Sequence, residues 1–254
     1  MRVCFIGDSH LGHIKTVWDE RQGSHPDWQV GFRVERTYGT EPLVIQDGEQ
    51  QATFEDITLA FSPDVDVRDW DAFVVFGMHY SAAAIAKVYP KFRSDAHAPS
   101  PKAYVLSEAA FREGIMDLLR ATKAGRVLAA LQALTDKPIL YVQQPNPLAW
   151  VRQRTEPKMR HFGRLSETGD YRSLSQLHGV ALDELEERGI AVLRQPAETK
   201  EDEFFTQDGY GLADPADTSE GSSFSKGDYF HMNAGYGRLV MDQLESWLVG
   251  VAGE

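Results

Sequence analysis

Short apolar runs that end in glycine or polar residues recur along the chain. The runs at 3–6 and 71–76 show almost no polar alternation, and they stop at Gly7 and Gly77. Continuous apolar runs of this length are typical of strands buried on both faces of a parallel sheet. Three further strands are predicted at 28–36, 139–142 and 190–193.

Apolar residues at intervals of three and four predict helices between these strands. The helices are expected at 11–21, 107–134, 174–188 and 239–248. Ser107 is the expected N-cap of the longest helix, and Gly125 is the expected site of a kink. The alternation of strands and helices predicts an α/β fold, a flavodoxin-like three-layer sandwich around a parallel, mostly five-stranded sheet.

A chain of 254 residues fits a single α/β domain, 1–254, with insertions. Three loop insertions are expected, at about 41–69, 144–173 and 196–227. The first contains β-prone pieces at 43–45 and 57–61, which predict a local hairpin. The third is acidic and rich in glycine and serine, so it is either a solvated surface loop or a lid. The segment 89–104 is expected to be an exposed connection.

The charge and the cysteine content exclude several classes of protein. A formal net charge of −12 argues against a general nucleic-acid or anionic-membrane binder, since both require a positive field. Cys4 is the single cysteine, so the chain can form neither an internal disulfide nor a cysteine-based metal cluster. The sequence shows no signal-like segment and no run of about 18 apolar residues, which makes the cytoplasm the expected location.

Asp8, Ser9 and His10 stand where the first predicted strand ends and a helix begins. In open α/β sheets this edge is where ligands bind, because the loops there form a crevice beside helix N-termini. A serine at this edge can act as a nucleophile. The alternative is that Asp8 and Ser9 only cap the following helix.

A serine nucleophile requires a base within hydrogen-bond distance and a group that orients this base. Asp228 and His231 lie three residues apart just before the C-terminal helix. At this spacing the carboxylate can face the ring nitrogen that does not face the serine, so Ser9, His231 and Asp228 are a candidate catalytic triad. The alternative is a turn capped by Asp228, with His231 packed beneath it.

With GDS after the first strand and a D-x-x-H block at 228–236, DYFHMNAGY, the sequence resembles the SGNH, or GDSL, hydrolase superfamily. The resemblance extends over the whole chain in order. It implies that Ser9 is the nucleophile, that His231 is the base and that Asp228 orients the base. It also implies that the backbone N–H of Ser9 donates to the oxyanion.

The same resemblance implies two further oxyanion positions. Gly39, after the second strand, is the expected second donor, with Gly31 and Gly48 as alternatives. The family's G-x-N-D block falls on GMHY, which starts at Gly77, so His79 occupies the position of the oxyanion asparagine. A neutral histidine can donate one N–H there, and the alternatives are a different substrate, a transferase or an inactive site.

A second resemblance uses the histidine after Ser9. The segment 8–12, DSHLG, also resembles the D-x-H opening of calcineurin-like metallophosphoesterases, which bind two metal ions. Those enzymes need G-D-x-x-D and G-N-H segments after later strands, where this chain has GMHYS and QQPNP. The bridging aspartate is absent, and the C-terminal D-x-x-H block is unexplained. A serine hydrolase without metal or other cofactor is therefore favoured.

The SGNH resemblance implies an ester hydrolase that acts through an acyl-enzyme on a carbohydrate or small-metabolite ester, with no nucleic acid or membrane as partner. An O-acyltransferase with the same triad and an inactive binding relative are alternatives. Possible substrate-binding residues are His10, Asn146, Arg152 and Arg154. The two arginines belong to a basic segment, 152–164, which can bind an anionic group of the substrate or pair with neighbouring carboxylates.

Overall fold

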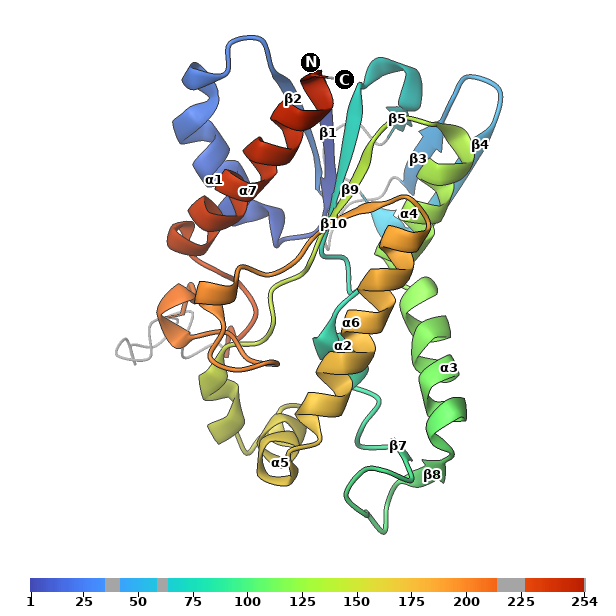
Figure 1. Cartoon of the computed structure of the whole chain (residues 1–254), viewed down its shortest axis with the longest axis vertical. Coiled ribbons are helices and arrows are strands. Elements are labelled where there is room, and N and C mark those ends of the chain that lie inside the picture. Colours follow the sequence, from blue (N-terminus) through green and yellow to red (C-terminus); the bar gives the residue numbers. More distant parts are fainter. Residues whose placement is uncertain (35–41, 59–63, 214–226, 254) are drawn as a thin grey trace.

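The computed structural model describes residues 1–34, 42–58, 64–213 and 227–253 of the chain. A five-stranded sheet with the order β10-β9-β6-β1-β2 lies at its centre, and all neighbouring strands are parallel (Figure 1). The side chains of β1 from Val3 to Ile6, and all those of β6, are buried, as their unbroken apolar runs require. The α/β fold with a parallel five-stranded sheet is confirmed. The strands are β1 (Arg2–Gly7), β2 (Gln29–Val34), β6 (Ala72–Phe76), β9 (Ile139–Val142) and β10 (Ala191–Leu193).

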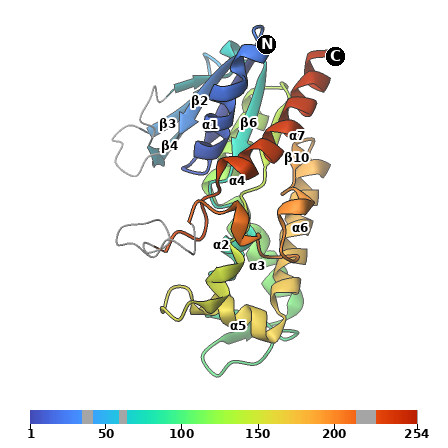
Figure 2. The same cartoon turned by 90° about the vertical axis from the view of Figure 1, so that its left-hand side faces the viewer.

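Helices flank the sheet on both sides, which gives three layers (Figures 1 and 2). α1 (Leu11–Arg21) and α7 (Ala234–Gly253) pack against each other on one side. Their backbones come close at Gly237, where a Cβ atom would lie 2.7 Å from the carbonyl oxygen of His13. α4 (Lys123–Leu134) packs on β6 and β9 from the other side. The remaining helices are α2 (Ala82–Ala86), α3 (Glu108–Arg120), α5 (Arg160–Thr168) and α6 (Tyr171–Glu187).

The prediction of one long helix at 107–134 was wrong, because the chain breaks there into α3 and α4. Ser107 does cap α3, with its side chain accepting a hydrogen bond from the N–H of Ala110. Thr122 starts the second helix: its hydroxyl accepts from the N–H of Gly125 at 3.2 Å. No kink lies at Gly125, where a Cβ atom would meet the carbonyl oxygen of Arg120 at 2.5 Å. The glycine therefore allows the end of α3 to approach α4.

The insertions carry structure of their own. β3 (Pro42–Gln46) and β4 (Gln51–Thr58) form an antiparallel hairpin, and β5 (Asp64–Asp66) joins β3 in parallel. A hairpin was predicted here from the pieces at 43–45 and 57–61, but its second strand lies at 51–58, and positions 59–61 lie outside the described residues. The second insertion contains α5, which periodicity did not indicate. In the third, short 3₁₀ turns occupy part of the stretch up to residue 213, and positions 214–226 lie outside the described residues.

The segment 89–104 was expected to be an exposed connection, and this prediction was wrong for much of its length. Tyr89 and Arg93 are both buried, with 0% and 2% of their surface exposed. Two short parallel strands, β7 (Phe92–Ser94) and β8 (Tyr104–Leu106), pair across the segment. Proline, serine and single charges suggested solvent, but the aromatic ring of Tyr89 and the stem of Arg93 supply enough apolar surface to be packed inside.

The order of the strands places a crevice at one edge of the sheet. The chain passes from β1 to β2 on one side and later to β6 on the other side of β1. Such a reversal opens a crevice at the carboxyl ends of β1 and β6, where ligands bind in open α/β sheets. Ser9 follows β1, and His79 follows β6, at this position.

Candidate active site

Ser9 lies on a tight turn between β1 and α1. The N–H groups of Leu11 and Gly12 donate to the carbonyl oxygens of Asp8 and Ser9, at 3.0 and 3.1 Å. Before the turn, a Cβ atom at Gly7 would lie 2.7 Å from a backbone carbonyl of β6, so glycine allows the two strands to come this close. The side chain of Ser9 is exposed at the end of this turn.

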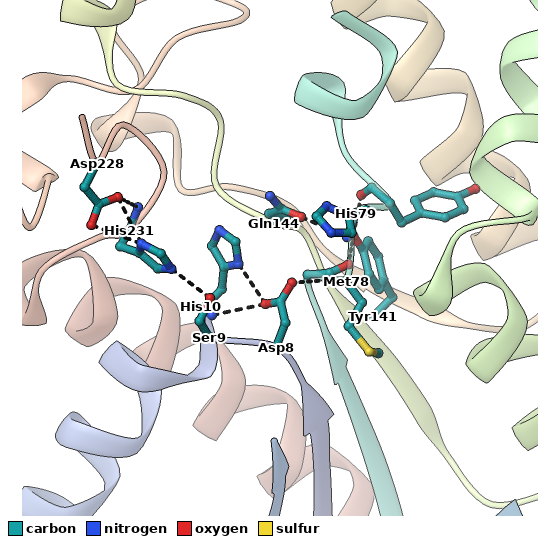
Figure 3. Close-up of polar contacts among 11 residues, drawn as sticks. Asp8, Ser9, His10, Met78, His79, Tyr141, Gln144, Asp228 and His231 are labelled. Atoms are coloured by element: carbon teal, nitrogen blue, oxygen red, sulfur yellow. Dashed lines mark hydrogen bonds and ion pairs between the residues drawn. The ribbon is translucent and has the colours of Figure 1, made fainter. Parts of the chain in front are cut away.

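Ser9, His231 and Asp228 form a continuous chain of hydrogen bonds (Figure 3). The Oγ of Ser9 lies 2.7 Å from Nε2 of His231. On the other side of the ring, Nδ1 lies 2.9 and 3.0 Å from the two carboxylate oxygens of Asp228. The structure therefore brings together the three residues that the sequence predicted as a triad, across 222 positions of the chain.

The turn from Asp228 to His231 orients its own side chains. Oδ1 of Asp228 accepts the backbone N–H groups of Phe230 and His231, at 3.3 and 3.1 Å, in addition to the imidazole. The carboxylate therefore fixes both the loop and the ring just ahead of α7. Since α7 packs on α1, the same helix pair brings this turn to Ser9.

The electrostatics of this pair suit a base and its partner. The hydrogen bond that its ring donates to Asp228 raises the pKa of His231 above its ordinary value, against the effect of burial. Burial would raise the pKa of Asp228, but the hydrogen bonds from His231 outweigh it and lower this pKa. Asp228 is therefore ionised at neutral pH and stabilises the imidazolium form of the ring.

The loop after β6 has an unusual backbone. Gly77, Met78 and His79 have φ values of 70°, 49° and 68°, all in the left-handed region. For residues with a Cβ atom this conformation costs about 1–2 kcal/mol each. Two buried side chains hold the loop: Oδ2 of Asp8 accepts the N–H of Met78 at 3.1 Å, and Oε1 of Gln144 accepts the N–H of His79 at 3.0 Å. The strained loop is thus fastened to the ends of β1 and β9.

Asp8 also binds His10, through the backbone N–H at 3.1 Å and through Nδ1 at 2.7 Å (Figure 3). Burial would raise the pKa of Asp8, but the contacts with His10 lower it below its ordinary value. The ring of His10 stacks on that of His231, with centroids 5.1 Å apart. Nε2 of His10 is buried and has no hydrogen-bond partner among the described residues. The Asp8–His10 pair therefore packs directly against the ring of His231.

These groups surround a cavity of about 300 Å³. Ser9, His10 and His79 lie on it, together with Gln144, which the sequence analysis did not single out. Eight of its eleven lining residues have polar or charged side chains, and the full set is Asp8, Ser9, His10, His79, Ser81, Ala83, Ala84, Lys87, Gln144, Phe230 and His231. Gln144 follows β9 directly, so its place after a strand at the same sheet edge was the signal that could have identified it.

Three glycines were considered as the second oxyanion donor, and the structure describes two of them, Gly31 and Gly48. Gly39 lies outside the described residues. Gly31 is inside β2 with the ring of Trp70 against it, and Gly48 is in the β3–β4 turn beside Arg68. Neither of these two lines the cavity.

The other proposed substrate-binding residues also lie outside this cavity. Asn146 is 3% exposed, and its backbone groups bond to the side chains of Gln195 and Thr206. Arg152 forms ion pairs with Glu201 and Asp202, and Arg154 pairs with the carboxylate of Glu156. The sequence left two roles open for these arginines, binding the substrate or pairing with carboxylates, and in the structure both pair with carboxylates. Their assignment to the substrate is therefore not kept.

Across the described ranges, no three side chains of His, Cys, Asp or Glu gather in a way that could hold a metal ion. A metallophosphoesterase requires such clusters, and the one aspartate that this chain shares with its opening motif, Asp8, is occupied by His10 and Met78. The geometry does not favour that alternative.

Comparison of the sequence with protein-family models gives no match, and comparison with curated proteins gives none either. No helix in the described part of the chain is long and apolar enough to cross a membrane.

Proposed function

We propose that the protein is a serine-dependent ester hydrolase of the SGNH type. The observation that carries this proposal is the hydrogen-bonded chain from Ser9 through His231 to Asp228. The sheet order also agrees with it, because the nucleophile stands at the crevice where α/β enzymes bind their ligands. Since one fold serves many functions, the triad supports the proposal more strongly than the fold does.

In the proposed reaction, Oγ of Ser9 attacks the ester carbonyl while Nε2 of His231 takes its proton. Asp228 stabilises the imidazolium that results. When the tetrahedral intermediate collapses, the C–O bond of the ester breaks and the alcohol leaves with the proton from His231. Water then attacks the acyl-enzyme with His231 as base, the acid is released, and Ser9 recovers its proton.

The developing oxyanion needs N–H donors, and Gln144 is a candidate alongside the backbone N–H of Ser9. A backbone N–H can pair only with an acceptor, so the oxygen of Gln144 must face His79, and the amide nitrogen takes the other position. In Figure 3 this nitrogen is on the side away from His79. We propose that this NH₂ group fills the role that the family's asparagine has in relatives, with His79 beside it.

The proposed substrate is a small polar ester of a carbohydrate or metabolite. The cavity holds about 300 Å³, and histidine, serine, glutamine and lysine side chains line it, with Phe230 as its one aromatic ring apart from the histidines. A long acyl chain would need a larger apolar surface. An acyltransferase would use the same triad with an alcohol in place of water, and no contact in the site favours it.

A fluorophosphonate probe tests the proposal, since it labels an activated serine covalently. The wild-type protein should be labelled and should hydrolyse a small acetyl ester, whereas Ser9→Ala should lose both. Ser81→Ala is the matched control, because Ser81 lines the same cavity and should not react. Label that persists in Ser9→Ala would remove Ser9 from the mechanism, and loss of ester turnover on treatment with a chelator would favour a metal enzyme instead.

A further inference from the structure

A second cavity, of about 400 Å³, lies between β7 and α5. Figure 1 shows both elements at the end of the molecule opposite the two termini. Four basic side chains line this cavity: Arg93, Lys102, Arg160 and Arg164. It shares no lining residue with the cavity at Ser9. Among the described residues that line it there is no aspartate or glutamate, although the whole chain has 38 acidic residues against 26 basic ones.

Of these four basic residues, Arg93 is the one whose side chain is buried. Only 2% of it is exposed, its Nε and Nη1 donate to the carbonyl oxygens of Tyr89 and Ala98, and its guanidinium stacks on the ring of Tyr89 at 3.9 Å. No carboxylate in the described part of the chain lies within ion-pair distance of it. The carboxylate of Asp170, which acts on it through space, instead accepts from Tyr89 Oη and the N–H of Ala98. Burying a positive charge that no carboxylate contacts directly is costly, and an anion in the cavity would offset this cost.

The other basic residues also lack carboxylate partners. Within the described ranges, neither Lys102 nor Arg160 has an ion pair, and Arg164 donates only to the carbonyl oxygen of Pro99, at 3.2 Å. Arg152 and Arg154 on the same insertion are both neutralised by carboxylates. No described carboxylate therefore contacts the four cations of the second cavity. Carboxylates do contact Arg152 and Arg154, which lie close by in the sequence.

The start of α5 adds to this positive field. The helix has nine residues and begins at Arg160, with no side-chain cap and no acidic residue in its first turn. The N–H groups of Arg160 and Phe162 already donate to the carbonyl oxygens of Glu156 and Met159, so it is the helix dipole that favours an anion there. His161, on the same turn, lines the cavity with 9% of its surface exposed, and its Nε2 has no partner in the described structure.

We propose that this cavity binds the phosphate group of a small phosphorylated molecule. Guanidinium groups match phosphate oxygens in pairs, lysine adds a point charge, and the dipole of α5 adds to the positive field. Four cations exceed what a single carboxylate requires, and the volume is larger than one phosphate ion, which leaves room for the rest of the molecule. The proposal does not depend on the ester chemistry at Ser9.

Isothermal titration calorimetry at constant ionic strength tests this site, with inorganic phosphate, glucose 6-phosphate and glucose as probes. Both phosphorylated probes should bind to the wild-type protein, and glucose should not. Lys102→Gln and Arg160→Gln change exposed side chains and should fold, and each should weaken binding about 10- to 100-fold, as expected for one charge-assisted hydrogen bond. Arg154→Gln is the matched control: it removes the same charge from the same insertion, outside the cavity, and should leave binding unchanged.

The proposal fails if the wild-type protein binds neither phosphorylated probe. It also fails if glucose binds as tightly as glucose 6-phosphate, since the phosphate would then contribute nothing. Equal weakening by Arg154→Gln and Arg160→Gln would mean that overall charge, and not this cavity, attracts the probe. Retention of wild-type affinity in the double variant Lys102→Gln, Arg160→Gln would place any bound phosphate elsewhere.

Discussion

At the scale of single residues, the contact between Asp228 and His231 governs the pH dependence of the proposed reaction. His231 must be neutral to take the serine proton, and its hydrogen bond to Asp228 raises its pKa above the ordinary value of 6.5. kcat/KM should therefore fall as the pH drops through a value above 6.5. In Asp228→Asn the negative charge is gone, so this acid limb should move to lower pH, while kcat at its plateau falls by about 10³–10⁴. A pH–rate series on both proteins measures this, and an acid limb that does not move would contradict the assigned role.

Gln144 can be tested by a change that keeps one of its two contacts. In Gln144→Glu the carboxylate can still accept the N–H of His79, but the NH₂ donor is lost. If this donor serves the oxyanion, kcat above pH 8 should fall about 10²- to 10³-fold with little change in KM. Steady-state kinetics on a small ester gives both constants. A kcat equal to that of the wild type would show that Gln144 only supports the loop after β6.

Asp8 is expected to contribute mainly to stability. Its carboxylate accepts the N–H of Met78 and two N–H groups of His10 in a buried position, and an amide cannot satisfy all of them. Asp8→Asn should lower the free energy of unfolding by about 2–3 kcal/mol. Asp19→Asn, which removes an exposed partner of Lys15, is the control and should change it by less than about 0.5 kcal/mol. Urea denaturation measures both, and equal values would show that the loop does not depend on Asp8.

The sequence predicted the triad because each part is local. Ser9 follows an apolar strand, and Asp228 and His231 are three residues apart. The long-range contact between Ser9 and His231 was inferred from the need of a serine for a base and from the family resemblance. The contact between Gln144 and His79 could not be predicted in this way, because it depends on β6 and β9 being neighbours. It also depends on a left-handed backbone at Met78 and His79, and neither residue type predicts that conformation. The assignment of Arg152 and Arg154 to the substrate failed for a similar reason, since their carboxylate partners became visible only in the fold.

At the scale of elements, alanine substitutions at two glycines near the junction of α3 and α4 are expected to change the free energy of unfolding in opposite directions. A Cβ atom at Gly125 would meet backbone oxygens at 2.5 and 2.6 Å, so Gly125→Ala should reduce stability by about 1–3 kcal/mol. At Gly114, within α3, there is nothing within 4 Å, so Gly114→Ala should increase stability by about 0.5–1 kcal/mol through helix propensity. Thermal or urea unfolding distinguishes them. Stabilisation by both substitutions would mean that the two helices are not in close contact.

The strands were predicted within one or two residues wherever an unbroken apolar run ends at glycine, as in β1, or follows proline, as in β9. The break between α3 and α4 was missed because apolar residues keep their spacing across it, and both helices bury that face. α5 was missed because it is short and strongly charged, and only its contacts with the core reveal His161, Phe162 and Leu165 as a buried side.

At the scale of the whole molecule, the sheet order and the pairing of α1 with α7 bring the two ends of the sequence to one crevice. The alternation of strands and helices was sufficient to predict the layers. It could not show that the segment 89–104 and the second insertion together line a basic cavity, since Arg93 and Arg160 are far apart in sequence and meet only through tertiary packing. Acidic residues elsewhere make the net charge of the chain negative, so the composition does not indicate this local positive field.

The central claim is that Ser9 carries the acyl group during turnover. Trypsin releases the segment 3–15, VCFIGDSHLGHIK, whose one serine is Ser9 and which contains no threonine or tyrosine. The protein should therefore be mixed with p-nitrophenyl acetate, quenched in acid and analysed by peptide mass spectrometry with fragmentation. We expect one acetyl group on Ser9 of this peptide in the wild-type protein, and no acetyl group on the same peptide in His231→Ala. Acetyl transfer to another residue, or full ester turnover in Ser9→Ala, would contradict the claim.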